Sequence, residues 1–150
     1  HDVADFEYDR KVIQFNRRLG NETVFSKSFT TDKKWTDGLS LFFFPRKYLT
    51  LKKSIKIPTF IEGLVYTTIN FNGDKIENVE IDKVDYPIRT IYFNGKADYN
   101  GVYGFSGNFE GWFTDDEARI PVKAKMKVLV GNVLIELQNW KRTGWKPPRA

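Results

Sequence analysis

Acidic and basic side chains gather in one short segment, Asp115-Asp116-Glu117-Ala118-Arg119. Two neighbouring carboxylates are groups that general acid–base catalysis or a cation site can use. Aspartate is equally typical of turns, where a nearby arginine can pair with it and fix the entry to the next strand. Adjacent acids on an extended chain point apart, and no third ligand stands at a suitable spacing. We therefore favour the turn, and assign Asp115, Asp116, Arg119 and the following Pro121 a structural role.

Other catalytic chemistries lack the residues that they need. The chain has no cysteine and one histidine, His1, at its start. Thiol nucleophiles, disulfides, zinc–thiolate sites and histidine-dependent triads are thereby excluded. Ser40 does not lie in a Gly-x-Ser-x-Gly elbow. Gly101, Gly104 and Gly107 lack the lysine of a phosphate-binding loop. The sequence predicts a protein that is not an enzyme and that uses no metal and no cofactor.

A basic stripe follows the acidic segment, with Lys123, Lys125 and Lys127 at every second position. Such a stripe fits an anionic partner, for example a lipid headgroup. It also fits a solvated sheet face, because alternating lysines prevent strands from aggregating. The net charge of +5 is dispersed, without a run of like charges, so nucleic-acid binding is not predicted. No stretch approaches about 18 apolar residues, so no transmembrane segment is expected.

Aromatic residues are abundant: thirteen Phe, seven Tyr and four Trp. Most rings of this kind form a core, but some can line a groove for a sugar or an acyl chain. If a groove exists, we assign Phe42, Phe43, Tyr103 and Trp112 to its apolar lining. The three lysines of the basic stripe would then contact a charged headgroup.

Strands must position these residues. Apolar and polar residues alternate between 120 and 137, and Gly131-Asn132 interrupts them as a two-residue hairpin signal. A two-residue loop there fixes the register. The pairs would be Val130 with Val133, Val128 with Ile135, Met126 with Leu137, and Lys127 with Glu136. We expect this hairpin, with Gly131 in its turn, to be the wall against which the rest of the chain packs.

Most of the remaining chain consists of short β-prone stretches bounded by turn residues. Three such stretches before residue 30 predict a small meander, and Asn72-Gly73-Asp74 and Asn94-Gly95 predict further turns.

One region differs from this pattern. Residues 37–49 show helical spacing of apolar residues, with Thr36 or Asp37 as the capping candidate, and Pro45 would kink or restart the helix. The apolar run 41–44 also fits a buried strand. The sequence as a whole predicts a mainly β fold: a strongly curved antiparallel sheet or open barrel of about eight strands, with one short helix around residues 37–49.

Three segments resemble the bacterial domain-of-unknown-function family numbered 3108: 37–46, with Ser40 and Arg46; Phe109 to Val122, with its aromatic strand, double acid and Arg-Ile-Pro; and Gly131 to Leu137. The resemblance carries no activity and no catalytic residues. It implies an exported protein of Gram-negative bacteria, in the periplasm or at the outer membrane. It also implies further N-terminal strands, so residues 1–150 are either one β-rich domain or the C-terminal part of a larger one.

Two functions stand close together. The first is a non-enzymatic envelope protein that binds or carries a lipid or another amphiphile in its curved sheet. The second is a structural domain that engages another envelope protein and has no small ligand. A hydrolase using Asp115 and Asp116 ranks third, and nucleic-acid binding fourth. The sequence leaves open the identity of the ligand, the oligomeric state and the closure of the barrel.

Overall fold

The computed structural model describes residues 1–38, 40–98, 107–127 and 131–150. These residues form a three-stranded sheet, with the order β1-β2-β3, and a seven-stranded sheet, with the order β10-β9-β8-β7-β6-β5-β4. Neighbouring strands are antiparallel except for β4, which is parallel to β5. The strands are β1 Asp2–Glu7, β2 Val12–Leu19, β3 Glu22–Thr30, β4 Thr36–Asp37, β5 Lys52–Phe60, β6 Leu64–Ile81, β7 Val84–Ala97, β8 Asn108–Thr114, β9 Pro121–Lys127 and β10 Asn132–Glu136. The short 3₁₀ helices are η1 Tyr8–Arg10, η2 Ser40–Phe42 and η3 Phe44–Lys47.

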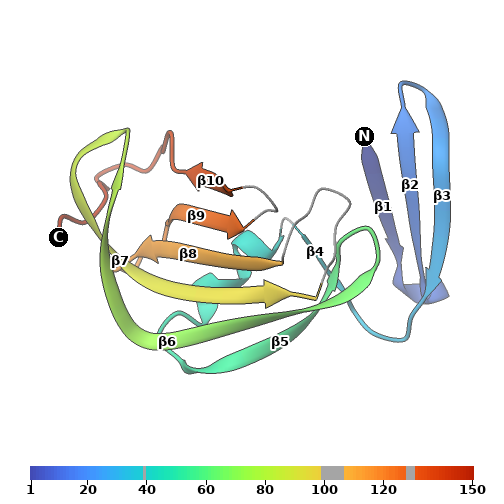
Figure 1. Ribbon diagram of the computed structural model, residues 1–150, viewed down its shortest axis with the longest axis horizontal. Coiled ribbons are helices and arrows are strands. Elements are labelled where there is room, and N and C mark those ends of the chain that lie inside the picture. Colours follow the sequence, from blue (N-terminus) through green and yellow to red (C-terminus); the bar gives the residue numbers. More distant parts are fainter. Residues whose placement is uncertain (39, 99–106, 128–130) are drawn as a thin grey trace.

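Figure 1 shows that the seven-stranded sheet is strongly curled and that η2 and η3 lie inside its curl. The mainly β, strongly curved fold is thus confirmed, with seven strands in the curled sheet. The predicted N-terminal meander is confirmed as the three-stranded sheet. One face of that sheet buries Ile13 and Phe15 against Trp35 and Phe60, which ties it to the larger sheet.

The curl depends on two long strands, β6 and β7. The predicted turns at Asn72-Gly73-Asp74 and Asn94-Gly95 are wrong, because β6 runs through the first and β7 through the second. The pairing of β6 with β7 is irregular between Phe71 and Ile76, and Gly73 lies in the left-handed region at φ +72°. A glycine in this conformation inside a strand forms a bulge, which bends the sheet.

The predicted helix around residues 37–49 is present as two consecutive 3₁₀ helices, η2 and η3. Pro45 lies in the first turn of η3, where its missing N–H costs nothing. Asp37 accepts the backbone N–H of Ser40 at 2.9 Å, as a capping residue does. The alternative of a buried strand over 41–44 is wrong. Leu41, Phe44 and other side chains of this segment pack on the core inside the curl. That core consists of Leu49, Ile57, Ile69, Phe71, Ile91, Phe93 and Phe113.

The predicted register of the last hairpin is wrong. The described part of β9 ends at Lys127 and β10 begins at Asn132, and Lys127 pairs with Asn132 and not with Glu136. Gly131 is in the connection, with φ +87°, whereas Val128 and Val130 lie outside the described residues. The observed pairs are Val133 with Met126, Leu134 with Lys125, Ile135 with Ala124, and Glu136 with Lys123.

The observed register differs from the predicted one by an even number of residues, so each side chain keeps its predicted face. The hairpin is not the wall of the core, however. Strand β10 is the edge of the sheet, and Val133, Leu134 and Ile135 remain 38%, 49% and 41% exposed. Local alternation cannot distinguish an edge hairpin from a central one, because both have the same period.

Candidate functional site

The turn between β8 and β9 is built around Asp116. Its Oδ1 accepts the Thr114 hydroxyl at 2.6 Å and the Arg119 backbone N–H at 3.0 Å, while Oδ2 accepts the Trp145 indole N–H at 2.6 Å. Burial raises the pKa of Asp116, but the hydrogen bonds from Thr114, Trp145 and two backbone N–H groups outweigh it and hold this pKa below its usual value. The ionised carboxylate of Asp116 therefore organises the turn.

The other charged residues of the turn are directed elsewhere. Asp115 accepts a hydrogen bond from Arg89 Nε at 2.7 Å. Arg119 takes a left-handed backbone conformation, with φ +45°. The sequence suggested that Arg119 pairs with an aspartate of the turn. Its guanidinium instead donates from Nη1 to the Arg46 carbonyl oxygen at 2.9 Å. These contacts support the turn role over a carboxylate pair. Within the part of the chain that the structure describes, no group of three or more His, Cys, Asp or Glu side chains is placed to hold a metal ion.

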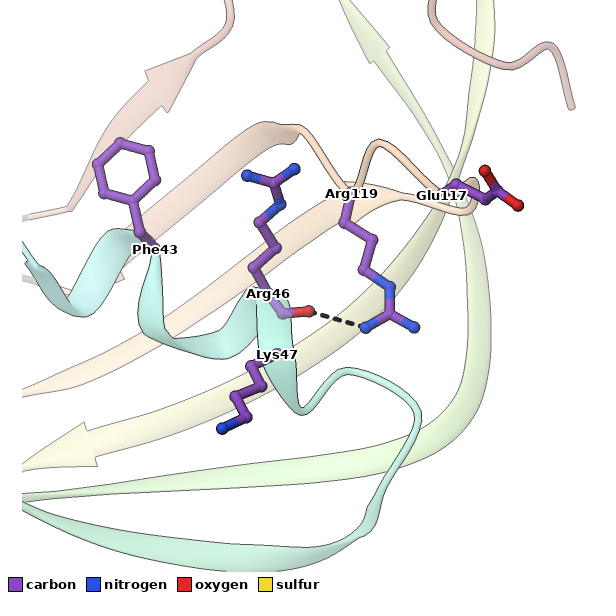
Figure 2. A pocket seen from close by; sticks show the side chains of 5 residues that line it. All are labelled: Phe43, Arg46, Lys47, Glu117 and Arg119. Carbon is purple, nitrogen blue, oxygen red and sulfur yellow. Dashed lines mark hydrogen bonds between the residues drawn. The ribbon is translucent and has the colours of Figure 1, made fainter.

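A hollow of about 540 Å³ lies where this turn meets η3. Its lining consists of Phe43, Arg46, Lys47, Glu117 and Arg119, which we call the cationic hollow (Figure 2). Figure 2 shows the Phe43 and Arg46 side chains extended to the same side of the segment, with the Glu117 carboxylate directed away from both. Three cations and one acid leave the hollow with an excess of positive charge. This arrangement suits an anionic group.

Reciprocal contacts hold the cationic hollow in place. Arg46 donates from Nη2 to the Ala118 carbonyl oxygen at 2.8 Å, in the opposite direction to the bond from Arg119. The segment that contains η3 and the turn that follows β8 are therefore fixed to one another although they are 72 residues apart. Phe43 is 63% exposed, whereas its neighbour Phe44 packs on the core. An exposed phenylalanine beside cations offers apolar and charged contacts together.

The concave face of the sheet is only partly covered. The η2–η3 segment packs over the core residues of β5 to β8. Opposite residues of antiparallel strands share a face, so the pairs of Phe109 with Met126 and of Met126 with Val133 continue this face onto β9 and β10. The next row adds Gly111, Ala124 and Ile135. Because Val133 and Ile135 remain exposed, the described residues leave an apolar strip uncovered at the β10 side of the curl.

The lysines of the basic stripe lie on the opposite, convex face. Lys123 pairs with Glu136 at 2.7 Å, in place of the predicted partner Lys127, and Lys125 lies 3.9 Å from Glu110. Trp112 also points to the convex face, since its neighbour Phe113 belongs to the core. Its indole N–H donates to Glu77 at 2.8 Å. The structure therefore does not bring Trp112 or the lysines together with Phe43.

The remaining candidates divide as follows. Phe42 is half-buried at the end of η2, Pro121 is the first residue of β9, and Tyr103 lies outside the described residues. The sequence analysis did not assign Arg46 or Lys47 to a site. Exposed cations after a proline carry no local signal, and only the contact between η3 and the turn groups them with Arg119.

Comparison with known proteins gives a family but no activity. A family model described as "Protein of unknown function (DUF3108)" matches residues 1–138. No curated protein and no solved structure matches the chain. Among the described residues, no helix has the length and apolar character needed to cross a membrane.

Proposed function

We propose that this chain, which belongs to the DUF3108 family of proteins of unknown function, binds an anionic amphiphile and does not transform it chemically. Its acyl chain would lie along the uncovered strip of the concave face, and its headgroup would lie in the cationic hollow. We further propose that it works in the periplasm or at the outer membrane, as the exported character of the family implies.

The observation that carries this proposal is the uncovered apolar strip in a sheet whose core is otherwise closed. Soluble proteins rarely leave a continuous row of apolar side chains in water without a partner. Met126, Val133, Ala124 and Ile135 form such a row on the concave side. Ala124 is five residues from Arg119 along the chain, so their backbones are at most about 17 Å apart. That span fits a long acyl chain whose headgroup lies beside Arg119.

Electrostatics supports an anionic headgroup in the cationic hollow. Arg46 and Lys47 are exposed, and the one acid of the lining is directed away from Arg46. A unit charge about 4 Å from an anion in water contributes on the order of 1 kcal/mol. The charge of the headgroup therefore adjusts the affinity, while burial of the acyl chain supplies most of the binding free energy.

Native mass spectrometry of protein purified from a Gram-negative periplasm, followed by organic extraction, tests for a bound amphiphile. We then expect lysophosphatidylglycerol to bind more tightly than lysophosphatidylcholine of the same chain length, because only the former has net negative charge. The double variant Arg46→Gln/Lys47→Gln should weaken binding of lysophosphatidylglycerol about tenfold or more and reduce its salt dependence.

Two matched controls address the choice of face. Lys125→Gln/Lys127→Gln removes the same charge from the convex face, and its affinity should stay at the wild-type value. Ile135→Thr should weaken binding and Leu134→Thr should not, because these similarly exposed neighbours point to opposite faces of β10. If the convex lysines rather than Arg46 and Lys47 govern the affinity, the headgroup lies on the other face and this placement is wrong.

The unpaired edge of β10 favours a second candidate function, a protein-interaction domain. In the described part of the sheet, β10 has a partner on one side alone and carries three exposed apolar residues. An open strand edge can pair with a strand of another protein. A clean mass without ligand, together with no binding of either lysolipid, would replace the amphiphile proposal with this one.

A further inference from the structure

A row of polar side chains crosses five strands on the convex face of the curled sheet. The register pairs Ser54 with Asn70, Asn70 with Asn94, Asn94 with Glu110, and Glu110 with Lys125, from β5 to β9. On β10 the row ends at Leu134. Opposite residues of antiparallel strands share a face, so this is one continuous row.

Hydrogen bonds fix the orientation of the row. Ser54 donates to Asn70 Oδ1 at 2.6 Å, and Asn70 donates to Asn94 Oδ1 at 2.8 Å. Asn94 then donates to the Tyr92 hydroxyl at 3.3 Å, and Tyr92 donates to Glu110 Oε1 at 3.0 Å. The donors all point in one direction, toward the Glu110 carboxylate. Burial is the largest cause that raises the pKa of Tyr92, which keeps this phenol protonated as a donor.

A hollow of about 550 Å³ lies at the end of this chain of hydrogen bonds. Amide, carboxylate and ammonium groups from four neighbouring strands line it: Asn94, Asn108, Glu110, Lys125, Lys127 and Asn132. Glu110 Oε2 and Lys125 Nζ are 3.9 Å apart, which is too far for a hydrogen bond. A hydroxyl group can bridge such a gap, because it donates to a carboxylate and accepts from an ammonium at the same time.

We propose that this convex hollow binds an uncharged saccharide, whose adjacent hydroxyls bridge Glu110 and Lys125 and bond the amides of Asn94 and Asn132. The Glu110 carboxylate accepts hydrogen bonds, the Lys125 ammonium donates them, and the amides do both, so each hydroxyl of a polyhydroxylated ligand finds a partner for its donor and its acceptor. Glu110 supplies a charged acceptor for these hydroxyls and offsets one of the two ammonium groups of the lining, Lys125 and Lys127. The site is on the opposite face from the cationic hollow, so it does not depend on the amphiphile proposal.

Side-chain amide signals in NMR spectra of the ¹⁵N-labelled full chain report on the hollow directly. Maltose, octyl maltoside below its micelle concentration, and glucose 6-phosphate are the probes. We expect maltose to shift the Asn94 and Asn132 amide signals, and octyl maltoside to shift them to the same extent. Glu110→Gln should weaken maltose binding about tenfold, since a hydroxyl loses its charged acceptor. Glu22→Gln, on the exposed β3 of the other sheet, should leave it unchanged.

A second pair of variants keeps the test valid if Glu110→Gln alters the fold. Asn132→Ala should weaken maltose binding, whereas Asn72→Ala, which removes an exposed amide outside the hollow, should not. No maltose-induced shift, or a shift that Glu110→Gln and Asn132→Ala both leave unchanged, overturns the proposal. So does a response to glucose 6-phosphate alone, which would make the hollow an anion site, or to octyl maltoside alone, which would place binding at an apolar surface.

Discussion

Asp116→Asn is the most informative single substitution in the turn between β8 and β9. Besides the Ala118 backbone N–H, the carboxylate accepts three hydrogen bonds, two at Oδ1 and one at Oδ2. Asparagine retains a single acceptor oxygen, so even its better orientation turns an amide N–H toward the Trp145 N–H. A hydrogen bond to a charged group contributes about 1.5–3 kcal/mol, and the two remaining bonds become neutral and weaker. We therefore expect Asp116→Asn to lower the free energy of unfolding by roughly 2–4 kcal/mol at neutral pH.

The pH dependence of this loss follows from the pKa of Asp116. The folded-state pKa is lower than the unfolded one, so the ionised carboxylate stabilises the fold. That stabilisation is complete above the unfolded pKa of about 4, and it is lost as the pH falls through the folded-state pKa. The difference between wild type and Asp116→Asn should therefore shrink in acid. Urea unfolding curves of both proteins, recorded in steps from neutral pH into this acid range, measure it.

Asp115→Asn is the matched control, because it makes the same chemical change one residue away. Asp115 pairs with the half-exposed Arg89, and an ion pair of this kind contributes only about 0–1 kcal/mol. Trp145→Phe should also destabilise wild type more than it destabilises Asp116→Asn, because the two residues share one hydrogen bond. Equal losses for Asp115→Asn and Asp116→Asn, constant with pH, would refute the role of Asp116 as the centre of the turn.

Two further substitutions test the core. Gly111→Ala should destabilise the fold by about 1–3 kcal/mol, because the added Cβ would lie 2.3 Å from the buried Phe93 ring. Gly63→Ala is the control, because a Cβ there would meet no atom within 4 Å. Equal urea unfolding midpoints for the two variants would contradict this packing. Thr67→Val should be neutral or stabilising by up to about 1 kcal/mol in the same assay. The reason is that the Thr67 hydroxyl is buried without a hydrogen-bond partner among the described residues. A loss of stability would show that the hydroxyl has a partner.

Much of the fold follows from patterns that span only a few residues. Alternation of apolar and polar residues predicted the mainly β fold, and the N-terminal meander was found at its predicted place. Pro45 and Asp37 predicted where the helical segment would restart and be capped. The family resemblance is confirmed by the match over residues 1–138.

The sequence analysis failed at turns whose strand partners are distant along the chain, and at the register of the last hairpin. Asn72-Gly73-Asp74 has the composition of a turn, but Asn72 pairs with Lys52 of β5, and pairs with β7 at Phe71 and Ile76 flank the segment, so it stays inside β6 as a bulge. The register of β9 and β10 was wrong because alternation along the two strands is the same in either register, so it could not decide that Lys127 pairs with Asn132. Glu136 consequently pairs with Lys123 instead of Lys127.

The candidate sites divide in the same way. The sequence by itself determined which residues alternate, and hence that Lys123 and Lys125 share one face of their strand, opposite its apolar residues. Only the tertiary structure decided that Arg46 and Lys47 meet Arg119, and that Ser54 and Glu110 belong to one polar row. The physical reason is that side-chain direction is a local property of the backbone, whereas grouping across the curled sheet requires strand pairings between distant segments, which only the folded chain brings together.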